Sequence, residues 1–178
     1  QPFTLTSAAT GQATMQWRKI VSGTTSNYGV LNDQDTTIAS STLVDSGLYF
    51  VQYTLGGTCG TAVSDTVKVT VVPAAFVSTD PANTTVCQGT TATLTATTQN
   101  ASGFAWTKNG TTITAGGNIT ITNTGSTQSV LSISNATATD AGNYRLIAQN
   151  VGSCVADTSA IATLTINAKP AIASTTLP

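Results

Sequence analysis

Hydrophobic and polar residues alternate in short runs along the chain. The runs ATLTA (92–96), VLSIS (130–134) and VKVTV (67–71) place an apolar side chain at every second position. This is the period of a β-strand that buries one face. Clusters of Gly, Asn and Asp separate the runs, as turns do, and no stretch combines a sustained helical period with caps. The pattern therefore predicts an all-β protein built from short antiparallel strands.

The same pattern of residues occurs twice. Residues 3–20 align with residues 92–109 at an offset of 89, and residues 45–71 align with residues 140–166 at an offset of 95. The difference in offset means that the second copy carries six extra residues between its tryptophan and its tyrosine. We expect these residues to add a hairpin within residues 109–129. A repeat of this length indicates tandem domains rather than a solenoid.

Each copy carries two markers of an immunoglobulin-like sandwich. A tryptophan stands mid-copy, where strand C of that fold holds a core tryptophan, and an Asp-x-Gly-x-Tyr motif stands where strand F begins. We expect the tyrosine hydroxyl to bond back to the backbone of the E–F corner, and the aspartate to cap that turn. Six residues receive these structural roles: Trp17, Trp106, Tyr49, Tyr144, Asp45 and Asp140. The predicted fold is two tandem immunoglobulin-like antiparallel β-sandwiches.

The cysteine motifs carry a family resemblance. Cys-x-Gly in VCQGTTATLTA (86–96) and Gly-x-Cys in NVGSC (150–154) resemble the Ig-like repeats of large secreted surface proteins of Bacteroidota. The resemblance implies a repeat without its first strand at 1–72, a complete repeat at 73–167, and the first strand of another repeat at 168–178. Arbitrary truncation of a longer array is the explanation we favour. The alternative is a polymer in which the tail of one subunit completes the next.

The cysteines do not occupy the usual inter-sheet bridge positions. Those positions hold Ser7, Val51, Ala96 and Leu146. Their small-and-large pairs indicate that packing replaces the bridge, and the Ser7 hydroxyl then needs a backbone partner.

The three cysteines, Cys59, Cys87 and Cys154, are an odd number, which predicts a partner outside the sequence or a free thiol. Cys87 is expected at the A–B turn and Cys154 at the F–G hairpin, at opposite ends of one domain. A seven-residue strand spans roughly 23 Å, whereas bridged Cα atoms lie within about 7 Å. We therefore favour bridges between neighbouring repeats, with a Cys87–Cys154 bridge as the alternative. Either arrangement implies an oxidising, extracellular location.

Composition narrows the range of functions. Charged residues make up 7% of the chain, the net charge is −1, and neither His nor Glu is present. Triads and zinc sites that need histidine are therefore excluded within this sequence, so we expect no enzyme, catalytic residue or cofactor. No basic patch indicates nucleic-acid binding, and no apolar run approaches the ~20 residues needed for direct membrane insertion. Asp33 and Asp35, with Asn32, form a weak calcium candidate, although a solvated turn is the preferred interpretation.

Three further features of the sequence bear on glycan binding or glycosylation. Trp17, Tyr28, Tyr53 and Phe104 are candidates for a carbohydrate-stacking platform, with Tyr28 expected to be exposed and Trp17 and Phe104 expected to face inward. Sequons for N-glycosylation occur at Asn83, Asn100, Asn109, Asn118 and Asn135, which we attribute to the Thr- and Asn-rich composition. The triplets at 35–37 and 65–67 resemble the short O-glycosylation motif of Bacteroidota.

The predicted role is structural and adhesive: a stalk, filament or adhesin shaft in a long extracellular repeat protein on a bacterial cell surface. In the family it resembles, such arrays belong to surface adhesins, including those used in gliding, and to other exported proteins. The expected partners are neighbouring Ig-like repeats of the same chain, with surface glycans, other cells and homo-oligomeric bundling as further candidates. The alternative function is a carbohydrate-binding Ig-like module of a secreted enzyme or adhesin.

Overall fold

The computed structural model describes residues 1–8, 13–56, 60–151 and 154–170. The chain divides into two compact units, Gln1–Pro73 and Ala74–Pro178. Apart from two single-turn 3₁₀ segments, η1 (Leu43–Asp45) and η2 (Ala138–Asp140), the regular structure is entirely β. Among the described residues, no helix has the length and apolarity needed to cross a membrane. The all-β prediction is confirmed.

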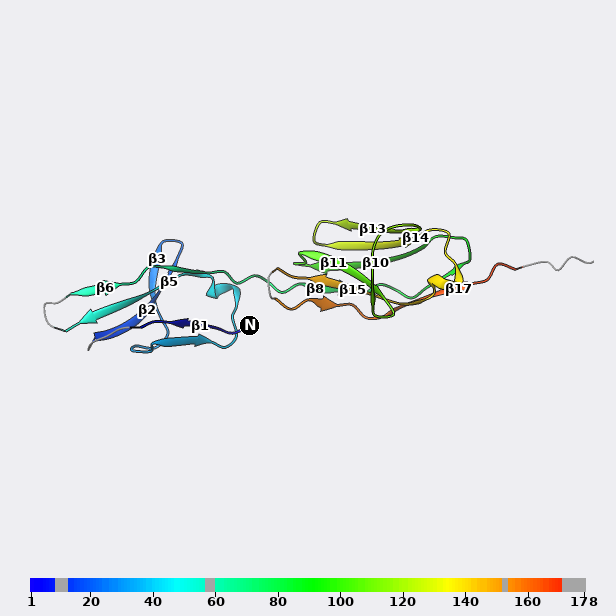
Figure 1. The fold of residues 1–178 in the computed structure, drawn as a ribbon. Helices are drawn as coiled ribbons and strands as arrows, with labels where there is room; N and C mark the ends of the chain where they lie inside the picture. The colour runs from blue at the N-terminus through cyan, green and yellow to red at the C-terminus, as the bar shows by residue number, and fades with distance from the viewer. Residues whose placement is uncertain (9–12, 57–59, 152–153, 171–178) are drawn as a thin grey trace, which may run out of the picture. The chain divides into compact units, whose positions relative to one another are not determined.

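The second unit is a sandwich of two sheets (Figure 1). Its strands are β8 (Phe76–Thr79), β9 (Thr84–Cys87), β10 (Ala92–Gln99), β11 (Gly103–Lys108), β12 (Thr111–Ile113), β13 (Ile119–Thr124), β14 (Gln128–Ile133), β15 (Gly142–Gln149), β16 (Asp157–Thr158) and β17 (Ala162–Asn167). One sheet has the order β13-β14-β10-β8, and the other has the order β12-β11-β15-β17-β9, with β16 beside β15. All pairings are antiparallel except β17 with β9, which is parallel.

The first unit repeats this plan with fewer strands. It contains β1 (Phe3–Thr6), β2 (Ala13–Val21), β3 (Thr24–Tyr28), β4 (Asp35–Ile38), β5 (Gly47–Leu55), β6 (Thr61–Val63) and β7 (Val67–Val69). Strands β1 and β4 form one sheet, and the other has the order β3-β2-β5-β6, with β7 beside β5. The β2–β3 turn, Ser22-Gly23, and its counterpart Asn109-Gly110 both have positive φ at each residue, as type I′ hairpins require.

The six extra residues account for a strand that only the second unit has. Strand β13 forms a hairpin with β14, closed by a bond from Thr127 N to Thr124 O at 3.2 Å, with Gly125 at φ 54°. In the first unit the six residues between β3 and β4 are all described, and they form no strand. The prediction of an added hairpin within 109–129 is therefore confirmed. Of the predicted strand at 168–178, residues 171–178 lie outside the described residues.

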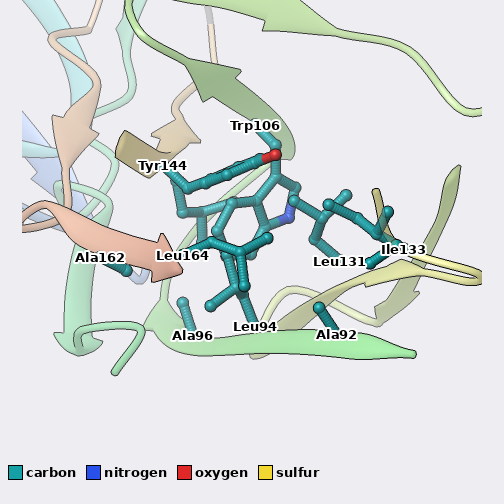
Figure 2. Close-up of a cluster of buried hydrophobic side chains, with 11 residues drawn as sticks. Ala92, Leu94, Ala96, Trp106, Leu131, Ile133, Tyr144, Ala162 and Leu164 are labelled. Atoms are coloured by element: carbon teal, nitrogen blue, oxygen red, sulfur yellow. The ribbon is translucent and has the colours of Figure 1, made fainter. Parts of the chain in front are cut away.

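The core of the second unit surrounds Trp106, which is fully buried (Figure 2). The cluster contains Ala92, Leu94, Ala96, Trp106, Leu131, Ile133, Ala136, Tyr144, Leu146, Ala162 and Leu164. Ala96 and Leu146, at the usual bridge positions, are both fully buried within it. Apolar packing therefore occupies the space of the missing disulfide. Burial of this kind stabilises a fold by roughly 25 cal/mol per Å² of apolar surface.

The core of the first unit is smaller. It comprises Leu5, Met15, Trp17, Tyr49 and Val51. Ser7 donates its hydroxyl to the Gln34 carbonyl oxygen at 3.3 Å and lies 3.2 Å from the Met15 sulfur. The expected backbone partner for the Ser7 hydroxyl is therefore present.

Candidate functional site

The two Asp-x-Gly-x-Tyr motifs form the same hydrogen-bonded corner. Tyr144 Oη donates to Asp140 O at 2.6 Å, and Tyr49 Oη donates to Asp45 O at 2.6 Å. Asp140 Oδ2 accepts bonds from the backbone N–H (2.8 Å) and the hydroxyl (2.9 Å) of Thr137, which caps η2. The corner joins the start of strand F to the preceding turn, so its chemistry is structural.

Burial and charge shift the pKa values of the corner residues. Burial raises the pKa of Tyr144 to about 12, and the nearby Asp140 carboxylate adds to the shift. The pKa of Tyr49 is raised for the same first reason, burial. The pKa of Asp45 is lowered, because its carboxylate accepts hydrogen bonds from the Thr42 backbone N–H first and the Thr42 hydroxyl second.

A lysine belongs to each corner, and our reading of the sequence missed it. Lys19 Nζ donates to Val44 O and lies 5.4 Å from the centre of the Tyr49 ring. Lys108 Nζ donates to Thr139 O, 5.9 Å from the ring centre of Tyr144. Each ammonium ties strand C to the 3₁₀ turn across an aromatic face. The signal was available, because a lysine stands two residues after the tryptophan in both copies.

The two core tryptophans differ in their hydrogen bonds. Trp106 Nε1 donates to Ser129 Oγ at 2.9 Å, and Ser129 Oγ donates to Asn123 Oδ1 at 2.7 Å. Trp17 Nε1 is buried and has no partner in the part of the chain that the structure describes. The repeat alignment places Gln34 at the position of Ser129, and Gln34 is exposed. Within the described part of the first unit, this polar atom of the core is therefore unsatisfied.

The four candidates for an aromatic platform do not form one, and Trp17 and Phe104 face inward as expected. Trp17 is only 4% exposed, and Phe104 packs against the core. The expectation that Tyr28 is exposed is wrong: its hydroxyl donates to Asp45 Oδ1 at 3.2 Å, and its ring packs edge-on against Tyr49 at 4.9 Å. Tyr28 pairs with Trp17 across β2 and β3, so the two side chains share the inward face. The fourth member, Tyr53, has a buried hydroxyl. Trp17 is thus buried and the other three are partly buried, so none of the four is a fully exposed aromatic.

The calcium candidate has the geometry of a turn. Asn32 Oδ1 accepts a bond from Met15 N at 2.8 Å, and Asn32 has φ 63°. Asp33 Oδ2 accepts a bond from the Thr36 hydroxyl at 3.3 Å, whereas Asp35 begins β4 opposite Thr6. The Asn32 and Asp33 side chains thus bind the chain's own donors, as Asn and Asp do in turns. No group of three or more His, Cys, Asp or Glu able to hold a metal occurs in the described residues.

The asparagines of the five sequons either adopt turn conformations or hydrogen-bond to the backbone. Asn100, Asn109 and Asn135 have φ between 49° and 57°, a region that Asn tolerates better than most residues. Asn83 Oδ1 accepts a bond from Thr163 N at 2.8 Å, and Asn118 Nδ2 donates to Ser134 O at 3.1 Å. Turn geometry and backbone bonding account for these five asparagines.

The two triplets that resemble an O-glycosylation motif differ in exposure. Thr36 is 7% exposed within β4, whereas Thr66 is exposed in a segment without secondary structure. Of the two hydroxyls, Thr66 is therefore the accessible one.

The cysteines of the second unit lie at opposite ends of its strands. Cys87 is exposed at the end of β9, opposite Asn167, and Cys154 follows the far end of β15 and is partly exposed. Following the strand register from β9 through β17 to β15 places Cys87 and the end of β15 next to Cys154 roughly 30 Å apart along the strand direction, at 3.3 Å per residue. Neither sulfur is in a disulfide, and the alternative Cys87–Cys154 bridge does not form. Cys59 lies outside the described residues, and bridges between repeats stay a prediction.

An open groove of about 620 Å³ lies beside the end of β10. Hydroxyl and amide groups line it, but several already bond to one another: Ser78 Oγ lies 3.0 Å from Thr97 Oγ1, and Thr98 Oγ1 donates to Ser126 O at 2.9 Å. The lining contains no charged or aromatic side chain. Small-molecule sites are usually enclosed and apolar with a few convergent polar groups, and this groove does not have that character.

The parallel pair of β9 and β17 is arranged so that a force pulling on the chain acts along the two strands. Four residue pairs run from Leu164–Thr84 to Asn167–Cys87, and Gln88 N extends the ladder to Asn167 O at 2.8 Å. A β-turn follows at 87–90, closed by Thr90 N to Cys87 O at 3.1 Å, with Gly89 at φ 88° as a type II turn requires. The chain enters the unit through β8, which pairs with β10, and then β9, and it leaves the unit through β17. Tension along the chain therefore pulls the two strands in opposite directions.

The comparisons with known proteins agree with the sandwich fold. The immunoglobulin I-set domain family matches residues 75–166, more than half of the chain. The chain is similar to the I-band fragment I67-I69 from titin, with a TM-score of 0.67 and 16% identity, over 94% of this chain and 59% of that one. An E-to-A variant of the same titin domains gives the same values.

A structure of titin M4 is similar at 23% identity and a TM-score of 0.50, over 55% of this chain and 100% of that one. The chain thus spans 59% of the length of the titin I67-I69 fragments. No curated protein matches it. At these identities the likeness to solved structures shows the fold alone.

Proposed function

Because the chain belongs to the immunoglobulin I-set family, we propose that it is a shaft segment of a long extracellular repeat protein on a bacterial cell surface, with a structural and adhesive role. Domains of this family serve as structural or interaction modules and are typically not enzymes. Two features of the sequence support the finer proposal: the tandem copies and the cysteine motifs that resemble surface repeats of Bacteroidota.

The observation that carries the proposal is the parallel β9–β17 pair. A force applied through the chain shears this pair along the strand direction, so its hydrogen bonds share the load. Peeling an antiparallel hairpin from its end would instead break the bonds one at a time. A unit that resists shear in this way suits a shaft that transmits force between a surface and a tip.

Force spectroscopy on the chain, tethered at its termini, tests the mechanical role. Gln88→Pro removes the bond from Gln88 N to Asn167 O, and proline fits the second position of a type II turn. We expect a lower unfolding force for the second unit. Its equilibrium stability should also fall, by about 1 kcal/mol, because proline at a position whose N–H is hydrogen-bonded is destabilising and a typical hydrogen bond contributes about 0.5–1.5 kcal/mol.

Asn118→Ala is the matched control. It removes the bond from Asn118 Nδ2 to Ser134 O, which lies outside the β9–β17 pair, and the unfolding force should stay unchanged. An unchanged force in Gln88→Pro contradicts the mechanical role.

The location is tested separately with antibodies against the chain, which should label intact cells of the source organism. Labelling only after permeabilisation contradicts the extracellular assignment.

A further inference from the structure

Strand β13 leaves part of its backbone open at the edge of the second unit. It pairs with β14 on one side, and on the other side Gly116 bonds to both the N–H and the C=O of Ile119, each at 3.0 Å. Both backbone groups of a residue in an antiparallel ladder point to the same side, and the side alternates along the strand. The groups of Ile121 and Asn123 therefore face outward, and no described residue pairs with this part of the edge.

Other edges among the described strands are protected or short. At β8 the Val77 N–H donates to the Asp157 carboxylate at 2.8 Å, and β4 begins with the exposed Asp35. Beside β3 the Arg18 guanidinium binds the Asn27 side chain, which places a positive charge at that edge. Strands β9 and β12 have four and three residues. Charges and short lengths of this kind are the usual protection of edge strands against pairing.

The edge at β13 has none of these protections. The strand ITITNT has six residues, with no charge and no proline, and its register with β14 is regular throughout. The other strands of its sheet, FVST, ATLTATTQ and QSVLSI, are also without a charged residue. Two copies of this sheet can therefore approach edge to edge with no like charges opposed on the strands.

We propose that β13 pairs antiparallel with β13 of a second copy of this chain around a two-fold axis. Ile121 then exchanges backbone hydrogen bonds with Asn123 of the second copy, and Asn123 with its Ile121, two bonds for each pair. Thr122 lies between them and faces Thr122 of the second copy as a non-hydrogen-bonded pair, with Cβ atoms roughly 5 Å apart. The same patch on both copies makes the interface, as a closed dimer requires.

The open edge belongs to one repeat of the two. Because the first unit has no strand between β3 and β4, its corresponding edge is β4, which carries Asp35. The six extra residues of the second copy thus create the docking surface as well as the strand. This proposal concerns association between copies and does not depend on the mechanical role.

Sedimentation velocity on the full chain, from micromolar to millimolar concentration with a thiol reductant present, tests the pairing. The unmodified chain should show a monomer–dimer equilibrium. Thr122→Asp and Thr122→Lys place like charges against each other across the axis. Each variant alone should lose the dimer, and an equimolar mixture of the two should recover it.

Thr95→Asp is the control, because it adds the same charge to an exposed threonine of the central strand β10. This variant should dimerise as the unmodified chain does. Circular dichroism melts check that every variant folds. The proposal is overturned by a chain that stays monomeric at millimolar concentration, by Thr122 variants that dimerise normally, or by a mixture that does not recover the dimer.

Discussion

The two units place the same tryptophan in different surroundings. In the second unit, Ser129 and Asn123 form a hydrogen-bonded path from the indole N–H to the added strand β13. In the first unit, Trp17 is also buried, but its indole N–H has no partner among the described residues. The difference teaches that the indole N–H depends on Ser129, which stands where the first unit has the exposed Gln34, and that Asn123 of the added strand then accepts the Ser129 hydroxyl. Comparing the two units therefore shows what a hydrogen bond to the core tryptophan contributes.

The largest expected effect comes from making the second unit resemble the first. Ser129→Ala removes the acceptor of Trp106 Nε1 and leaves a buried donor unpaired, which we expect to destabilise the second unit by about 1–3 kcal/mol. Urea denaturation followed by tryptophan fluorescence measures this. Gln34→Ala at the aligned, exposed position of the first unit is the control and should change stability by less than about 0.5 kcal/mol. Equal losses of stability in Ser129→Ala and Gln34→Ala would contradict the difference between the two cores.

An intermediate effect is expected at the tyrosine corner. Tyr144→Phe removes the bond to Asp140 O and should destabilise the second unit by about 1 kcal/mol at neutral pH. The folded pKa of Tyr144, about 12, lies above the ordinary value of 10. Its contribution is therefore complete below pH 10 and is lost as the pH rises through 12.

Thermal melts between pH 8 and pH 12 should show a smaller alkaline loss of stability in Tyr144→Phe than in the unmodified chain. Tyr49→Phe is the matched variant in the first unit, where the same bond of 2.6 Å is removed. Identical alkaline slopes in Tyr144→Phe and the unmodified chain would contradict the assignment to this hydroxyl.

The smallest expected effect is on the stability of the first unit at acid pH. The pKa of Asp45 is below its ordinary value of 3.8, because Thr42 donates two hydrogen bonds to its carboxylate. A depressed pKa means that the stabilisation is complete above pH 3.8 and is lost as the pH falls through the folded value. Asp45→Asn should flatten this acid dependence, measured by melts between pH 2 and pH 5. A variant that keeps the full acid dependence would show that another group causes it.

Local patterns predicted the parts of the fold that depend on local physics. The alternation of apolar residues predicts strands because burial of one face has a period of two. The Asp-x-Gly-x-Tyr spacing predicts the tyrosine and aspartate bonds of the corner because each joins residues no more than four positions apart. The added hairpin followed from the difference in offset between the copies and from its glycine turn signals.

Features that depend on strand pairing were harder to predict. Tyr28 faces inward because the Ser22-Gly23 turn sets it opposite Trp17, and this register depends on the turn type rather than on the pattern of apolar residues. The lysines of the corners were overlooked because their partners, Val44 and Thr139, lie more than twenty residues away. The open edge of β13 depends on the order of strands in the sheet, which a linear pattern of residues does not contain.

The uncharged sheet of the second unit has a consequence for where the protein can work. The distance over which charges act in solution shrinks from about 30 Å at 0.01 M salt to about 3 Å at 1 M. The strands β8, β10, β13 and β14 contain no charged side chain on which this change can act. Contacts made through these four strands therefore involve no charge on the strands that salt can screen, in fresh water or in brine.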